Sequence, residues 1–223
     1  MKASGFVKYI DGSGKKKHID GEISIDESHL QLLKVCGDVQ FDSMQLDELK
    51  VEGSIEGRQI KSALMKIDGD IDVMDIVSKQ FKVCGNVSAN HLVADEFKLD
   101  GSMNCKKIKA SNVNLCCTGK TFISEIMADN LQIKKRVKEN NTKGILFKIF
   151  RANTMKDFAV EIESIRSKDV ILSGIFVNEI IGENVKLENG CCVNKLLCAK
   201  KPIVSNDSLV KDLVVDEIGR AHV

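Results

Sequence analysis

Glycines and apolar residues recur together every sixteen residues over the first half of the chain. The glycines stand at positions 21, 37, 53, 69, 85 and 101. As a result, KVCGDV at residues 34–39 returns as KVCGNV at residues 82–87, and the copies between them read KVEGSI and KIDGDI. A fixed period of this kind is the sequence signature of a repeat architecture.

Apolar residues keep a fixed register to each glycine. Leu33, Leu49, Met65, Phe81 and Phe97 stand four residues before it, and Ile19, Val35, Val51, Ile67, Val83 and Leu99 stand two before. Ile23, Val39, Ile55, Ile71, Val87 and Met103 stand two after it, and Met44, Ile60, Ile76, Leu92 and Ile108 seven after. Small or apolar residues such as Ser62, Ser78, Ala94 and Ala110 stand nine after. The alternation across the glycine is strand periodicity, and no stretch sustains a helical stripe.

A sixteen-residue unit is too short for a helix pair or a propeller blade, but it suits one rung of a parallel β-solenoid. Each rung would hold two or three short strands, with glycine at a tight turn because it tolerates φ > 0. Rungs stack at ~4.8 Å, so equivalent residues form ladders and the inward ladders form a continuous core. The sequence therefore predicts an all-β parallel β-helix, or β-solenoid, with 16-residue rungs.

The outward positions predict a column of lysines beside a mostly acidic column. The lysines are Lys34, Lys50, Lys66, Lys82 and Lys98. Two residues later stand Asp20, Cys36, Glu52, Asp68, Cys84 and Asp100. Because each lysine would have carboxylates beside it, we interpret this surface as a solvated, self-neutralising face. A track for anionic lipid or another polyanion is the alternative, and it would favour a face without acids.

The period breaks after Gly101, because the next glycine, Gly119, comes eighteen residues later. A basic insert follows at residues 134–157, and residues 121–160 hold eight basic and four acidic side chains. One interpretation is a loop with a strand or short helix packed on the solenoid. The other is a basic, apolar element that docks a membrane or a partner. Its candidate docking residues are Lys134, Lys135, Arg136, Lys138, Lys143, Phe147, Lys148, Phe150 and Arg151.

The strand pattern returns at Phe158, and Gly174 and Gly190 again lie sixteen residues apart. We expect an N-terminal leader at residues 1–9, a solenoid at 10–133, and a continuing or second solenoid segment at 158–200. Residues 201–223 are expected as a C-terminal tail, although SLVKDLVV within it could supply a last strand.

The final residues 217–223, EIGRAHV, fit no column. We interpret them as a candidate translation of a sequencing adapter, in which case the natural chain continues past Asp216. A longer reading frame in a clean assembly would support this hypothesis, and the same stop codon in the genome would reject it.

Composition narrows the functional classes. The 223 residues include 33 basic and 32 acidic side chains, 43% hydrophobic residues and only 4% aromatics. No apolar run approaches the ~18 residues of a membrane-spanning helix, and the first residues lack the apolar core of a signal peptide. We therefore expect a cytoplasmic protein, with the inner face of the membrane as a further candidate position. The eight cysteines lack C-x-x-C spacing, so we expect small apolar side chains, with a metal site or regulatory thiol as the alternative.

Motifs for catalysis and nucleotide binding are absent or incomplete. TGKT at residues 118–121 resembles the end of a phosphate-binding loop, but Asn114 stands where that motif needs its first glycine. The four histidines have no recognised catalytic or metal-binding spacing to cysteines or carboxylates. One tyrosine and no tryptophan leave few rings for stacking on nucleic acid. We expect no enzyme, no cofactor, no metal, and neither nucleotide nor nucleic acid as a partner.

The order of the rungs is similar to that of a known family. YIDGSG precedes HIDGEI, LCCTGKTFISEIMADNLQIKK precedes the insert, and SKDVILSGIFVNEIIGENVKLENGCCVNKL follows it. Over about residues 8–200 the chain resembles the bactofilins, and more closely the bactofilin-like polymer-forming cytoskeletal proteins of Firmicutes. The resemblance implies a right-handed β-helix that polymerises end to end without nucleotide. It also implies a bacterial cytoplasmic scaffold whose partner is itself, with the membrane surface or cell-envelope proteins as further candidates. The chain departs from the bactofilins proper, which have one compact helix domain without this insert.

The physics of a solenoid agrees with polymerisation. Its two ends expose unpaired strand edges, which recruit another chain unless they are capped, and a head-to-tail contact that does not close gives a filament. The candidate assembly residues are Ile19, Ile23 and Ile25 at one end and Leu187, Val193 and Leu196 at the other.

The sequence therefore predicts a non-enzymatic self-assembling scaffold. The first alternative is a monomeric binding module that docks a partner or membrane through its basic insert. The second is a β-helix enzyme, either an acyltransferase of the hexapeptide-repeat kind or a polysaccharide-active enzyme. The sixteen-residue period argues against the former and the missing export signal against the latter.

Overall fold

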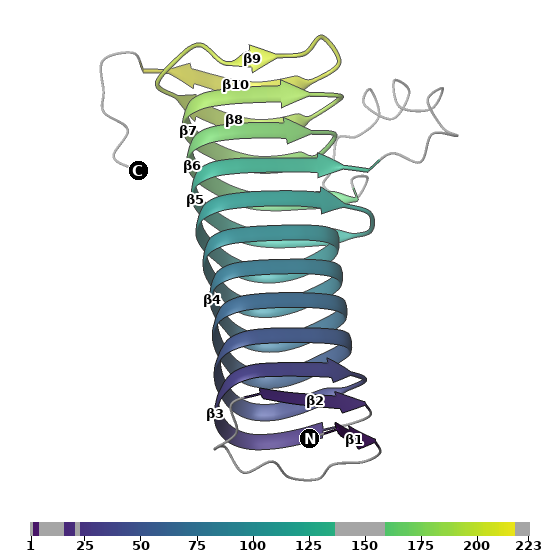
Figure 1. Ribbon diagram of the computed structural model, residues 1–223. Helices are drawn as coiled ribbons and strands as arrows, with labels where there is room; N and C mark the ends of the chain where they lie inside the picture. Colours follow the sequence, from purple (N-terminus) through teal and green to yellow (C-terminus); the bar gives the residue numbers. More distant parts are fainter. Residues whose placement is uncertain (1, 5–15, 21–22, 137–158, 217–223) are drawn as a thin grey trace. The chain divides into compact units, whose positions relative to one another are not determined.

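The computed structural model describes residues 2–4, 16–20, 23–136 and 159–216, and their side chains from residue 31 onward (Figure 1). Within these ranges the chain forms strands and no helix, which confirms the predicted all-β class. The strands are β1 (Lys2–Ser4), β2 (Lys16–Asp20), β3 (Ile23–Cys36), β4 (Val39–Cys117), β5 (Thr121–Lys135), β6 (Val160–Ser173), β7 (Phe176–Glu188), β8 (Cys192–Cys198), β9 (Ile203–Val204) and β10 (Leu209–Val215).

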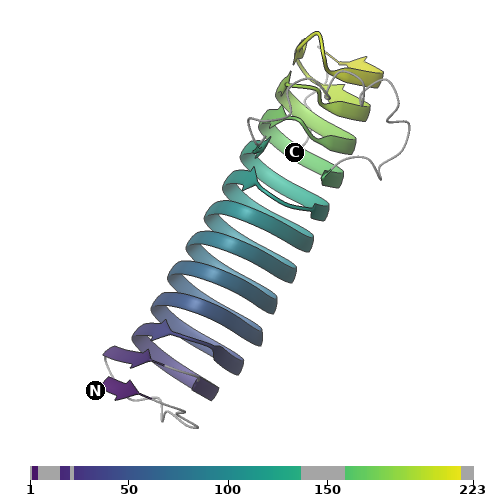
Figure 2. The ribbon, with the colours of Figure 1, turned by 90° about the vertical axis from the view of Figure 1, so that its right-hand side faces the viewer.

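The chain divides into two compact units, Met1–Cys105 and Lys106–Val223. In the first unit every strand pair in the described residues is parallel, and partners lie one sixteen-residue period apart. Examples are Lys2↔His18, Ile19↔Val35 and Ile23↔Val39. Each rung therefore hydrogen-bonds to the next, as predicted for a β-solenoid, and Figure 2 shows the rungs of β3 and β4 coiling in succession.

The predicted inward columns form the core of the first unit. Leu33, Leu49, Met65, Phe81 and Phe97 are all fully buried, and Met44, Ile60, Ile76 and Leu92, seven residues after a glycine, are buried as well. The Phe81 and Phe97 rings stack with their centroids 5.2 Å apart. Two buried serines in the column nine after the glycine lie with their Oγ atoms 3.3 Å apart, which satisfies hydroxyls that would otherwise be costly to bury.

A further inward column, which the sequence pattern did not predict, lies four residues after the repeated glycines. It holds Phe41, Gly57, Val73, Ala89 and Cys105. A Cβ added to Gly57 would overlap the ring of Phe41 on the preceding rung. The small residue therefore makes room for the large one, and the mixed sizes conceal the column in the sequence.

The repeated glycine occupies a position that admits no side chain. Gly69 has φ +144°, a backbone region that favours glycine, and Gly37, Gly53 and Gly85 have similar values. A Cβ on Gly69 would overlap the carbonyl oxygen of Gly53 on the preceding rung. The predicted positive φ is confirmed at these four positions, and close rung contact adds a second requirement for glycine.

The second unit is also a parallel solenoid, but its rungs differ in length. Its register partners include Thr121↔Val160, Ile165↔Ile180, Val177↔Val193 and Val193↔Val210. The strands that flank the insert thus pair directly with each other. The segment after the insert continues the sheet to which β5 belongs.

Residues 201–216 correct the expectation of a C-terminal tail. Ile203 and Val204 of β9 pair with β7, and β10 pairs in parallel with β8. Residues of β10 pair in register with the inward columns of β8, so β10 adds one more rung to the solenoid. Within the described residues, the solenoid of the second unit therefore extends beyond residue 200 and includes β10.

Candidate functional site

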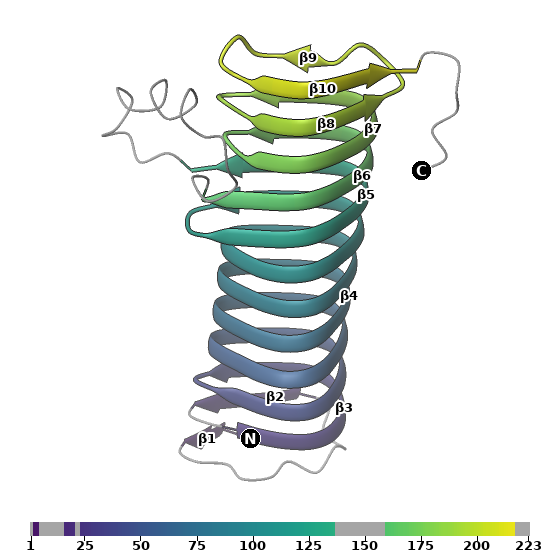
Figure 3. The ribbon, with the colours of Figure 1, turned by 180° about the vertical axis from the view of Figure 1, so that it is seen from behind.

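The C-terminal edge of the second unit carries exposed apolar side chains. β10 is the last strand in the sheet order, and no strand pairs with its outer side within the ranges that the structure describes (Figure 3). Ile203 is 64% exposed and Leu213 is 48% exposed. The other exposed apolar residues of these two strands are Val204, Leu209, Val214 and Val215. Apolar side chains on a strand edge favour contact with another chain.

The C-terminal assembly residues predicted from the sequence lie one rung too deep. Leu187, Val193 and Leu196 are fully buried, because Val204, Val210 and Leu213 pair over them in register. These three residues belong to the core and not to the end, so their prediction is wrong. Alternation alone does not distinguish a covered rung from the terminal one.

At the N-terminal end, Ile19 is also not on the edge strand. It pairs with Val35 on one side and with Ala3 of β1 on the other. Ile23 and Ile25 pair with β4. Their side chains, and residues 5–15, lie outside the described part of the chain, so their assignment to the assembly end stays a prediction.

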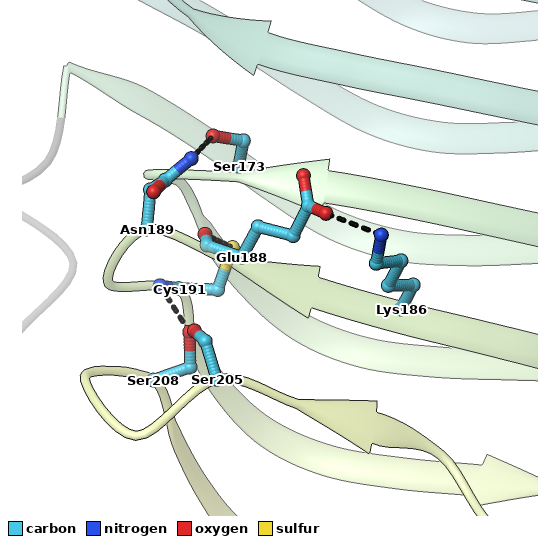
Figure 4. Close-up of polar contacts among 7 residues, drawn as sticks. All are labelled: Ser173, Lys186, Glu188, Asn189, Cys191, Ser205 and Ser208. Atoms are coloured by element: carbon cyan, nitrogen blue, oxygen red, sulfur yellow. Dashed lines mark hydrogen bonds and ion pairs between the residues drawn. The ribbon is translucent and has the colours of Figure 1, made fainter.

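A polar network holds the last turns of the second unit in place (Figure 4). The Cys191 backbone N–H donates to Ser208 Oγ at 3.0 Å, and Ser208 Oγ lies 2.8 Å from Ser205 Oγ. Asn189, in the left-handed region with φ 51°, donates from Nδ2 to Ser173 Oγ at 2.8 Å. Backbone hydrogen bonds also join each end of the β9–β10 connection to the rung beneath it. These hydrogen bonds hold β9 and β10 against the rung beneath them.

The basic insert begins at the end of β5. Lys134 and Lys135 are the last two residues of β5, and both are exposed. The backbone N–H of the next residue, Arg136, donates to the Cys117 carbonyl at 2.8 Å. The remaining predicted docking residues lie outside the described residues, and their role stays a prediction. They are Lys138, Lys143, Phe147, Lys148, Phe150 and Arg151.

The lysine column points outward, as predicted, but its closest carboxylate differs from the expected one. Lys50 pairs with Glu48, two residues before it, and not with Glu52, two residues after. All three share one face of the strand because side chains alternate. A hydrogen bond from Lys50 lowers the pKa of Glu48, and the charges of Lys34 and Lys66 act in the same direction.

All eight cysteines are free thiols, and most of them are buried. Burial raises the pKa of Cys117 to about 11, and it raises the pKa values of Cys191, Cys192 and Cys198 as well. Cys36 and Cys84 are exposed on the outward acidic column. The thiolate is the reactive form, so burial protects the first group and leaves Cys36 and Cys84 accessible.

We expect a thiol-alkylating reagent at about pH 8 to modify Cys36 and Cys84 well before Cys117, because only a small fraction of a buried thiol with a raised pKa is ionised. Mass spectrometry of timed digests measures the order. Denatured protein is the control, in which all eight thiols should react alike. Equal rates for Cys36 and Cys117 in the folded protein would contradict the burial described above.

Within the described ranges, no cluster of three or more His, Cys, Asp or Glu residues could hold a metal ion. The same ranges contain no helix that is long and apolar enough to cross a membrane. Comparisons with protein-family models, with curated proteins and with solved structures find no match to this chain.

Proposed function

We propose that the chain is a non-enzymatic, bactofilin-like scaffold whose copies assemble end to end, without nucleotide, through the edge strands of their solenoid units. The observation that carries this proposal is the apolar C-terminal edge formed by β9 and β10. Six large apolar side chains of these two short strands remain exposed on a rung that is otherwise firmly anchored.

Within the described residues, the edge carries little of the usual protection against strand pairing. Proteins generally protect exposed edges with charges, proline, bulges or a covering segment. Over Leu209–Val215, β10 has only Lys211 and Asp212 as charged residues among five apolar ones. A strand from another copy would satisfy the outer row of backbone N–H and C=O groups and cover the apolar side chains at the same time.

The first unit supplies a second edge, because β1 is the first strand in the sheet order. A contact between two unlike edges repeats from copy to copy and gives an open polymer unless the rotation closes a ring. Parallel pairing of β10 with a first strand would continue the ladder with the same hydrogen-bond pattern that joins the rungs within each unit.

Replacing Leu213 and Val215 with aspartate should abolish assembly. Two carboxylates would have to lose water in an apolar contact, and we expect the concentration needed for assembly to rise roughly 100-fold or more. High-speed sedimentation over a protein dilution series measures this concentration. The matched control is Met74→Asp with Val93→Asp, since these residues are 52% and 43% exposed and belong to β4 and not to β9 or β10.

The control variant should sediment like the unmodified chain. Equal sedimentation of the Leu213→Asp/Val215→Asp variant and the unmodified chain would rule out the C-terminal edge as the assembly surface. Loss of assembly in both variants would show a general effect of added charge and would also count against the proposal.

A further inference from the structure

One face of the first unit is acidic and lacks cationic partners. Asp38, Glu56, Asp70 and Asp72 are exposed one or three residues after the repeated glycines. Serine and amide side chains donate to three of them, for example Asn86 Nδ2 to Asp70 Oδ1 at 2.8 Å. Among the described residues none of the four pairs with lysine or arginine, whereas nearby Asp42 pairs with Arg58. We call these four residues the acidic face.

The parallel register makes this arrangement costly. Glu56 and Asp72 occupy equivalent positions on successive rungs, ~4.8 Å apart, and like charges opposite each other destabilise a sheet. The acidic face occupies consecutive rungs and has no lysine column of its own. A cationic surface with the same rung spacing would relieve this repulsion.

The second unit carries such a surface at one of its turns. Lys120, Lys134 and Lys135 are all exposed, and we call them the basic turn. Two backbone hydrogen bonds bring them together: the Arg136 N–H donates to the Cys117 carbonyl at 2.8 Å, and the Thr121 N–H donates to the Ala159 carbonyl at 2.7 Å. The short loop before β5 and both ends of the insert therefore lie at the same turn.

The insertions of a solenoid often gather on the face that binds a partner. In the second unit, the ion pairs among the described residues involve Lys107, Lys186 and Lys195, and none involves Lys120, Lys134 or Lys135. The charge of Lys120 does act on half-buried Glu161, whose pKa burial raises. Lys120, Lys134 and Lys135 thus form no direct ion pair with a carboxylate in the part of the chain that the structure describes.

We propose that the basic turn of one copy docks on the acidic face of a second copy, so that assembled polymers associate side by side. This inference rests on the proposed function for its polymeric form, and it adds a lateral contact to the end contact. A second copy is the partner that the charges favour, because the same chain carries both the basic turn and the acidic face. The opposite charges of the two surfaces are in keeping with the net charge of the chain, which is only +1.

The lateral contact should depend on salt, and the apolar end contact should not. The Debye length falls from ~10 Å at 0.1 M to ~3 Å at 1 M ionic strength, so exposed charge pairs are screened. Each copy in a polymer contributes both charged surfaces, so weak single contacts add up along its length. High salt should therefore separate bundles into single polymers without dissolving them.

Charge reversal tests the contact directly. We expect Lys134→Glu/Lys135→Glu and, separately, Asp70→Lys/Asp72→Lys to reduce low-speed sedimentation of bundles at least roughly tenfold, with high-speed sedimentation of polymers unchanged. A mixture of the two variants should restore bundles, since each supplies the surface that the other lacks. Lys66→Glu/Lys98→Glu in the lysine column is the matched control and should bundle normally.

A second measurement does not require polymers. Equal amounts of ¹⁴N- and ¹⁵N-labelled full-length protein are treated with a zero-length carbodiimide crosslinker. Mixed-isotope peptides that join Lys134 or Lys135 to Asp70 or Asp72 are expected at low salt and should disappear at high salt. Absence of these peptides, or bundling that ignores salt and charge reversal, overturns the lateral contact. If the unmodified chain forms no species that sediments at high speed, that result would instead reject end-to-end assembly.

Discussion

Gly69→Ala is expected to prevent the first unit from folding. The added Cβ would overlap the Gly53 carbonyl oxygen, and φ +144° is unfavourable for alanine. The oxygen belongs to the backbone of the adjacent rung, which cannot shift without disturbing the hydrogen-bonded ladder. We therefore expect a loss above about 4 kcal/mol, at the extreme of single substitutions. Circular dichroism and urea unfolding measure it.

Gly174→Ala is the matched control for this substitution. Gly174 also has a positive φ, +69°, but its nearest neighbours to an added Cβ would be 3.4 Å and 3.6 Å away. Only the backbone preference is then lost, at a cost of about 1 kcal/mol. If the Gly69 and Gly174 variants lose similar stability, close rung contact is not what selects glycine in the repeat.

Phe97→Ala should cause the second large loss of stability, about 3–5 kcal/mol. Phe97 is fully buried, and its ring stacks on Phe81 at a centroid distance of 5.2 Å with an interplanar angle of 15°. Truncation opens a cavity between rungs and removes the aromatic pair, which itself contributes roughly 0.5–1.5 kcal/mol. Urea unfolding at one fixed protein concentration measures the change, because assembly would otherwise contribute to apparent stability.

Phe122→Ala provides the comparison for Phe97→Ala. Phe122 is 38% exposed on β5, so the same change leaves no closed cavity there, and we expect a loss below about 1 kcal/mol. Equal losses at the two positions would mean that the column containing Phe97 is not the packed centre of the first unit.

Much of the first unit could be predicted because its period is strict. Once glycine recurs every sixteen residues, a residue such as Leu49 must lie on the same ladder as Leu33, and both are indeed buried. The column through Phe41 and Gly57 escaped because it is defined by complementary sizes and not by uniform apolarity. Whether two side chains on neighbouring rungs fit together depends on the sizes of both, so neither position alone reveals the column.

The candidate site was harder to predict, for a physical reason. Leu196 and Leu213 occupy the same column and have the same side chain, yet one is fully buried and the other is 48% exposed. Only the position of the last rung distinguishes them. The basic turn was likewise hidden, because Lys120 and Lys134 come together through backbone hydrogen bonds at a turn and not through any sequence motif.

The two kinds of surface follow from the same repeat. A stack of rungs leaves strand edges where it ends, and it repeats each outward side chain along its length. The apolar edge at β10 suits association along the stack, whereas the acidic face and basic turn suit association beside it. Sequence changes at Leu213 and at Lys134 should thus affect different steps of assembly.

The most direct measurement is sedimentation velocity with negative-stain electron microscopy of the unmodified full-length chain, in reducing buffer without nucleotide. The proposed scaffold predicts large sedimenting species that appear as polymers, formed above a threshold protein concentration and retained at high salt. A single monodisperse species of monomer mass at all accessible concentrations would contradict end-to-end assembly and would favour a monomeric binding module.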